Sequence, residues 1–164
     1  AMVFSAKQAE EIVRWSKFAP LGFRGLNNSG FDGRFTLVPQ AQFVQEANEK
    51  SWVAIQIETL DAVECVDEIA AIDGVDLLFV GPSDLSQALG VTGDFMNPKC
   101  QAAIDKVAAA CRKQNKPWGA VTPTPEHCEM LFAKGCRMLS MTNDSRFINA
   151  GLNAVKTQFA KFFA

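Results

Sequence analysis

The chain has 164 residues with 16 basic and 18 acidic side chains, which gives a net charge of −2. A balance this near neutral argues against nucleic acid and anionic membrane surfaces as partners. No apolar run approaches the roughly 20 residues that cross a bilayer, and no secretory leader is evident. The five cysteines are odd in number and form no C-x-x-C pair, so we expect a reducing, cytoplasmic setting.

Apolar runs and helical patterns alternate along the chain. Strands are predicted at residues 1–4, 52–57, 75–80, 118–121 and 137–141. Helices are predicted at residues 5–19, 41–50, 59–73, 85–88, 98–114, 125–134 and 147–163, and a loop rich in Gly and Asn at 27–39. Ser5, Thr59 and Thr124 are placed to cap three of these helices. The alternation predicts βαβ units, a parallel sheet and a single α/β domain over residues 1–164.

Two of the predicted strands each end beside a carboxylate. Glu58 follows the run 52–57, and Asp84 follows the run 75–80 within the segment GPSDLS at 81–86. The carboxyl ends of parallel strands are where α/β proteins hold ligands, and hard divalent cations prefer carboxylate oxygens. The pair therefore predicts a metal site. The alternative is that both carboxylates only cap the helices that follow them.

Several segments resemble the HpcH/HpaI aldolases. They are QIET at 56–59, GVD at 74–76, FVGPSDLS at 79–86 and, upstream, PLGFRG at 20–25. The resemblance covers essentially the whole chain. It implies a TIM (β/α)8 barrel of the phosphoenolpyruvate/pyruvate type, of which this chain holds only about strands four to eight. It also implies a class II, metal-dependent carbon–carbon lyase that cleaves a 2-oxo-4-hydroxy acid to pyruvate and an aldehyde.

The same resemblance implies roles for individual residues. Glu58 and Asp84 would hold Mg²⁺, Mn²⁺ or Co²⁺, and backbone amides around Ser83 and Asp84 would seat the pyruvate carboxylate. Gln56 lies one pleat from Glu58 and shares its face, so it either lines the barrel at the substrate or satisfies a buried backbone group. Arg24 either binds a substrate anion or anchors its loop through a salt bridge, and we favour the salt bridge.

The chain also departs from the family, because its motifs align from strand four onward. The family's histidine base and its arginine belong to strands two and three, so the catalytic residues are unknown in this sequence. His127, the only histidine, falls in a late helix far from that position. Five strands do not close an eight-stranded barrel. A truncated or mis-started gene, a fragment of a longer enzyme, or two copies covering each other's open sides would each account for this, and we expect weak or no activity from the chain alone.

Two other functions remain as alternatives to the aldolase. The fold and its two carboxylates also suit a citrate-lyase-like or malyl-CoA-lyase-like enzyme. The other alternative is a truncated, non-catalytic remnant that oligomerises.

The end of the chain bears on the oligomeric state. The stripe Phe159, Phe162 and Phe163 is typical of a core. In the family, however, the final helices pack against a partner subunit. We therefore expect a homo-oligomer, from a dimer up to a hexamer.

Overall fold

One parallel sheet forms the centre of the molecule. The computed structural model of the chain describes residues 1–162. Its strands β1 (Ala54–Ile57), β2 (Leu77–Val80), β3 (Trp118–Val121) and β4 (Met138–Ser140) lie side by side in chain order. All three pairings are parallel, so every strand ends at the same edge of the sheet. This is the arrangement of a barrel wall, and it confirms the predicted α/β class.

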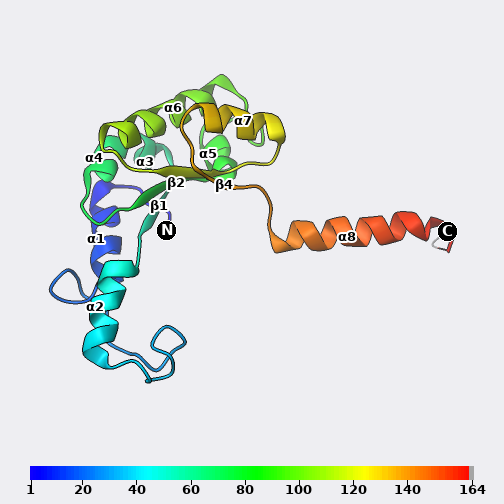
Figure 1. Cartoon of the computed structure of the whole chain (residues 1–164). Helices are drawn as coiled ribbons and strands as arrows, with labels where there is room; N and C mark the ends of the chain where they lie inside the picture. Colours follow the sequence, from blue (N-terminus) through cyan, green and yellow to red (C-terminus); the bar gives the residue numbers. More distant parts are fainter. Residues whose placement is uncertain (163–164) are drawn as a thin grey trace.

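Helices connect the strands and cover one face of the sheet. Two precede the sheet, α1 (Ala6–Ser16) and α2 (Gln40–Lys50). Those that follow β1 are α3 (Leu60–Glu64), α4 (Val66–Ala71), α5 (Pro82–Ala88), α6 (Pro98–Lys113), α7 (Pro125–Ala133) and α8 (Asp144–Gln158), with a 3₁₀ turn at Ala160–Phe162. Helices α3 to α7 lie on the same side of the sheet (Figure 1). No helix within residues 1–162 is long and apolar enough to cross a membrane.

Local sequence sets three of the helix starts as predicted. The side-chain oxygens of Ser5, Thr59 and Thr124 each accept a hydrogen bond from the backbone N–H three residues later, at 3.3, 3.1 and 3.2 Å. Each bond satisfies one of the backbone donors that a helix leaves free in its first turn. These caps fix where α1, α3 and α7 begin, and therefore how long the preceding strand segments can be.

The strand predicted at residues 1–4 is wrong in extent. This segment makes one isolated parallel bridge, between Met2 and Gln56, and the Gln56 N–H donates to the Ala1 carbonyl at 2.8 Å. Pairing stops there because Ser5 caps α1, which turns the chain away from the sheet. The helix predicted at 59–73 is likewise divided into α3 and α4 at Cys65, whose φ and ψ are −98° and 20°.

The core lies between the sheet and the covering helices. The strands contribute Ile55, Ile57, Leu78, Val80, Trp118 and Ala120, and the helices contribute Ile69, Ile104, Val107, Cys111 and Leu131, all of them buried. The predicted apolar face of residues 98–114 is thus confirmed. At roughly 1.5–3 kcal/mol for each large side chain buried, this layer is the main source of stability.

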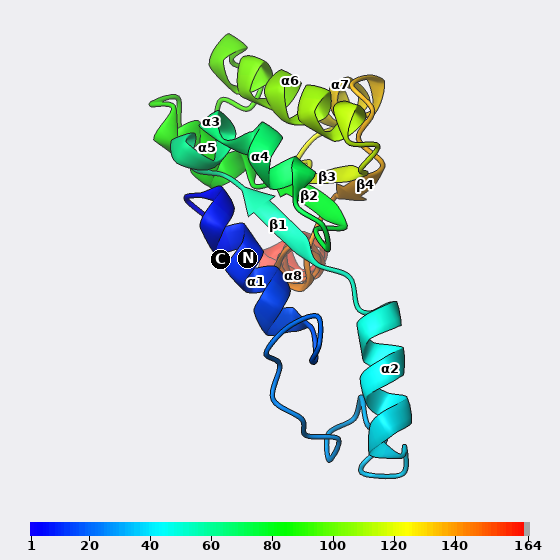
Figure 2. The same ribbon diagram turned by 90° about the vertical axis from the view of Figure 1, so that its left-hand side faces the viewer.

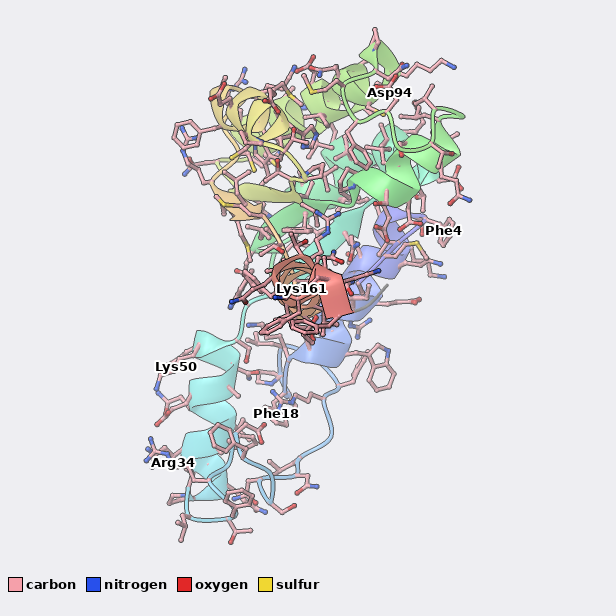
Figure 3. The ribbon with its side chains drawn as sticks, turned by 90° about the vertical axis from the view of Figure 1, so that its right-hand side faces the viewer. Phe4, Phe18, Arg34, Lys50, Asp94 and Lys161 are labelled. Atoms are coloured by element: carbon pink, nitrogen blue, oxygen red, sulfur yellow. The ribbon has the colours of Figure 1, made fainter. Side chains whose placement is uncertain are left out.

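Two helices project from this body. Helix α8 extends away on one side and α2 on the other (Figures 1 and 2). We call the projecting segment, residues 24–50, the α2 arm. Arg34 lies at its far end and Lys50 at the end nearest the sheet (Figure 3). In the same arm, Arg24 forms a salt bridge with Asp32 at 3.0 Å, in agreement with the loop-anchoring interpretation.

Helix α8 has no buried residue, so the prediction of a core stripe at the chain end does not hold within this chain. Phe159 is 44% exposed and Phe162 is 70% exposed. Phe163, the third residue of that stripe, lies outside the described residues.

Candidate metal centre

The two predicted carboxylates share one cleft. Glu58 directly follows β1, and Asp84 lies in the first turn of α5, just past the end of β2. Both line a cleft of about 390 Å³ at the carboxyl edge of the sheet. The other residues of its wall are Met2, Phe4, Thr59, Leu60, Asp61, Gln87 and Ala88. Neighbouring parallel strands therefore bring these two side chains together, as their sequence positions predicted.

The Glu58 carboxylate is buried and nearly unpartnered. Its residue is 5% exposed, and the single hydrogen bond that it accepts comes from Gln56 Nε2, at 2.6 Å. Burial raises the pKa of Glu58 above its ordinary value, the charge of Asp84 adds to this, and the Gln56 hydrogen bond opposes it. The site thus holds concentrated negative charge, which a cation would stabilise. Gln56 thus donates a hydrogen bond to the Glu58 carboxylate. Neither of the two roles predicted for Gln56 included this contact.

Gly81 makes room for that carboxylate. A Cβ at this position would lie 2.0 Å from Glu58 Oε2 and 3.1 Å from Gln56 Nε2. Only a glycine allows the Glu58 side chain to lie against the end of β2. Sequence reasoning missed this role, although the glycine stands inside the motif that pointed to Asp84. The all-oxygen donor pair of Glu58 and Asp84 fits a hard divalent cation.

Helix capping does not account for Glu58. Thr59 caps α3 through its own hydroxyl, and no hydrogen bond joins Glu58 to the backbone of that helix. Asp84 does lie in the first turn of α5, where a negative charge is favourable at the amino end of the helix. The capping alternative therefore explains the position of Asp84 but does not explain why the Glu58 carboxylate is buried.

The start of α5 presents free backbone donors next to Asp84. Pro82 is the first helical residue, and the Gly81 cap makes no side-chain hydrogen bond. The N–H groups of Ser83 and Asp84 belong to the first turn, where no carbonyl four residues earlier is available within the helix. Both residues are exposed. Of the two residues predicted to donate to the oxo acid, Asp84 lines the cleft and Ser83 does not.

Other candidate residues lie elsewhere. His127 is buried against Thr122, with 3.2 Å between its Nδ1 and the Thr122 hydroxyl, and it does not line the cleft. Arg24 is held by Asp32 in the α2 arm. Within residues 1–162 no group of three or more His, Cys, Asp or Glu side chains is arranged to hold a metal ion. The described residues around Glu58 and Asp84 therefore show no three-ligand site.

Comparison with known proteins decides the family. The family described as HpcH/HpaI aldolase/citrate lyase matches residues 1–150. The chain belongs to this family. An HpcH/HpaI aldolase from Desulfitobacterium hafniense, solved by crystallography, superimposes with a TM-score of 0.80 at 34% identity, over 94% of this chain and 62% of that one. The chain is therefore part of a TIM barrel, as the motifs implied.

Curated HpcH/HpaI relatives are longer than this chain. A 5-keto-4-deoxy-D-glucarate aldolase of Klebsiella pneumoniae is 31% identical over 97% of this chain and 61% of its own length. A 4-hydroxy-2-oxo-heptane-1,7-dioate aldolase of Escherichia coli is 29% identical over 96% of this chain and 60% of its own. The chain thus spans about three fifths of the relatives that it matches, and the similarity extends through both motifs.

Proposed function

We propose that this polypeptide contributes the metal-binding part of a class II aldolase, which cleaves a 2-oxo-4-hydroxy acid to pyruvate and an aldehyde. The observation that carries the proposal is the buried Glu58 carboxylate, which fits over Gly81 and shares a cleft with Asp84. Family membership and the aldolase names of the relatives support it. We further propose that residues 1–164 belong to one partial barrel domain.

Glu58, Asp84 and Gln56 each have a defined task in this proposal. Glu58 and Asp84 hold a divalent cation, Mg²⁺, Mn²⁺ or Co²⁺, and Gln56 fixes the Glu58 carboxylate through its 2.6 Å hydrogen bond. The N–H groups of Ser83 and Asp84 bind the carboxylate of the oxo acid. When bound, the cation supplies Lewis-acid stabilisation of the negative charge that develops on the keto oxygen.

The proton-transfer part of the reaction requires residues beyond these. Among the described residues that line the cleft there is no histidine, lysine or arginine to act as a base or to offset the enolate charge. We expect the 164-residue chain to bind metal and oxo acid but to turn substrate over weakly or not at all.

Metal and pyruvate binding test the proposal without requiring turnover. Calorimetric titration with MnCl₂ is performed with and without pyruvate on the wild type, Glu58→Gln and Asp84→Asn. We expect pyruvate to tighten Mn²⁺ binding to the wild type and both variants to lose that binding. Asp61→Asn is the matched control, because Asp61 lines the same cleft and is not a proposed ligand. Mn²⁺ affinity that is unchanged in Glu58→Gln would contradict the assignment.

We also propose that the protein is a homo-oligomer held together by α8. Its exposed apolar side chains recur at helical spacing, at Phe147, Ile148, Leu152, Val155 and Phe159. An uncovered stripe of this length on a projecting helix favours packing against another protein surface. Light scattering tests this: Leu152→Asp should lower the molar mass to that of a monomer, whereas Asn153→Asp on the same helix should not. A wild-type monomer would refute the proposal.

A further inference from the structure

The one histidine of the chain is buried in a part of the molecule that the proposed reaction does not use. His127 is the third residue of α7 and is 1% exposed. Its ring lies against Phe95, with 5.9 Å between the ring centroids. On another side its Nδ1 lies 3.2 Å from the hydroxyl of Thr122, which is 2% exposed and directly follows β3. The ring therefore contacts both the loop between β3 and α7 and the segment that leads into α6.

Thr122 decides which nitrogen of the ring carries the hydrogen. Its hydroxyl donates to the Thr124 carbonyl at 3.1 Å. A hydroxyl has a single hydrogen to donate, so the Thr122 oxygen accepts from His127, and the Nδ1 of the neutral ring is protonated. Nε2 is then the unprotonated nitrogen. It is buried, and within residues 1–162 it has no hydrogen-bond partner.

A second proton would have to bind at Nε2. The result would be a buried cation with an N–H that has no acceptor among the described residues, and burying such a group is costly. The first turn of a helix also disfavours positive charge, because the helix dipole is positive at that end. The titratable groups on the contacting segments are Asp94 near Phe95, and Glu126, Cys128 and Glu129 on α7. Burial alone lowers the pKa of His127, so none of these groups offsets the added charge.

The same loop forms the wall of a cavity and the start of α7. Residues 122–125 line a cavity of about 420 Å³ at the carboxyl edge of the sheet. The Thr124 hydroxyl accepts the N–H of His127 at 3.2 Å, and the Thr124 carbonyl accepts the N–H of Cys128 at 3.0 Å. Because Thr122 bonds both to the ring and to Thr124, displacement of the ring removes a support of this loop.

We propose that His127 is a pH-sensitive latch on the loop between β3 and α7. The neutral ring holds the loop closed, and uptake of a solvent proton at Nε2 drives the ring from its site and opens residues 122–128. The opening is local, so the sheet and the other helices stay folded. The latch is independent of the proposed metal centre, because His127 does not line the cleft of Glu58 and Asp84.

The size of the effect follows from linkage between the proton and the open loop. In the open loop the ring is in water, where the pKa of histidine is about 6.5. If the closed loop takes up no proton, the equilibrium constant for opening rises about tenfold between pH 7.5 and pH 5.5. Partial protonation of the closed loop reduces this ratio. We therefore expect an increase of about three- to tenfold.

Hydrogen exchange of the native protein tests the latch at the amides of His127 and Cys128. Rates at pH 7.5 and pH 5.5 are corrected for the intrinsic pH dependence of exchange. We expect protection to fall by about three- to tenfold at pH 5.5 in the wild type, and His127→Gln, whose side chain is neutral at both pH values, to remove the difference. The matched control is the Ala62 amide, which donates to the Thr59 cap of α3 at 3.1 Å and should keep its protection. A smaller fall, or an equal fall at Ala62, would overturn the proposal.

Nitrogen-15 NMR of the ring tests the same latch without a variant, so a misfolded His127→Gln does not prevent the test. The chain has one histidine, so its two ring nitrogens are observed without competing signals. We expect the hydrogen on Nδ1 at pH 7.5. A neutral ring with its hydrogen on Nε2 would contradict the latch. So would a charged ring at pH 5.5 that keeps both its contact with Phe95 and the protection of the His127 amide.

Discussion

Replacement of Gly81 by alanine is the most direct test of the metal centre. The added Cβ would lie 2.0 Å from Glu58 Oε2, whereas real contacts of this kind are essentially never shorter than 3.0 Å, so the oxygen must move by about 1 Å. The backbone of Gly81, at φ −94° and ψ 95°, is open to alanine, so the effect would not come from backbone strain. The substitution therefore acts on the carboxylate and on its hydrogen bond from Gln56.

The size of the effect follows from the displacement. Metal–ligand distances hold to within about 0.2 Å, so a shift of about 1 Å removes Glu58 as a ligand. We expect Mn²⁺ affinity to fall at least tenfold, equivalent to about 1.4 kcal/mol. The atom in the way is the end of the flexible Glu58 side chain, which can move into the cleft. We therefore expect the free energy of unfolding to change by less than about 1 kcal/mol, or roughly 2–4 °C in Tm at most for a domain of this size.

Calorimetric titration with MnCl₂ and thermal unfolding measure the two effects in the same sample. Gly25→Ala is the control, because a Cβ there would meet no heavy atom within 4 Å. The reasoning would be refuted if Gly81→Ala bound Mn²⁺ as tightly as the wild type. Such a result would mean either that Glu58 is no ligand or that its carboxylate moves without cost.

Three further predictions concern stability. The raised pKa of Glu58 means that the native state holds its proton more tightly than the unfolded state, so stability should decrease as pH rises above 4.5. Urea unfolding in chelator at pH 7 should accordingly give a higher free energy of unfolding for Glu58→Gln than for the wild type, and a lower one would contradict this. Burial lowers the pKa of His127, so wild-type stability should fall as pH decreases below 6.5. This slope should weaken in His127→Asn between pH 7.5 and 5.5, and an identical slope would exclude His127 as its source. Buried Lys17 donates to two carbonyl oxygens at the carboxyl end of α2, so Lys17→Met should destabilise the arm by about 1–3 kcal/mol and speed its proteolysis, whereas exposed Lys7→Met should not.

The parts of the fold that local chemistry decides were predictable from the sequence. The caps at Ser5, Thr59 and Thr124 each depend on a side chain and a backbone donor three residues apart, so they can be read from the sequence directly. The juxtaposition of Glu58 and Asp84 was predictable for a similar reason. Parallel strands share a carboxyl edge, and both residues follow apolar runs closely.

The parts that depend on distant contacts were not predictable. The apolar pattern of α8 indicates that this face packs against another surface. It does not indicate whether that surface belongs to the same chain or to another molecule. The segment 1–4 has the composition of a strand, yet its pairing is limited by the helix that begins at Ala6. The steric role of Gly81 appears only once the Glu58 side chain has a position.

The burial of Glu58 is the observation that most favours the proposed metal site over an incidental pair of acids. An ionised carboxylate has about four positions at which it accepts hydrogen bonds, and the described residues fill one of them, through Gln56. Removing such a group from water is costly unless another charge compensates it. The charge of Asp84 raises the pKa of Glu58, and the positive amino terminus of Ala1 lowers it. Lys17 satisfies its own buried ammonium with carbonyl oxygens, so the fold does supply partners where a charge is merely structural. At Glu58 it supplies an open cleft instead, which Asp84 also lines, and a divalent cation is the partner that we propose for these two carboxylates.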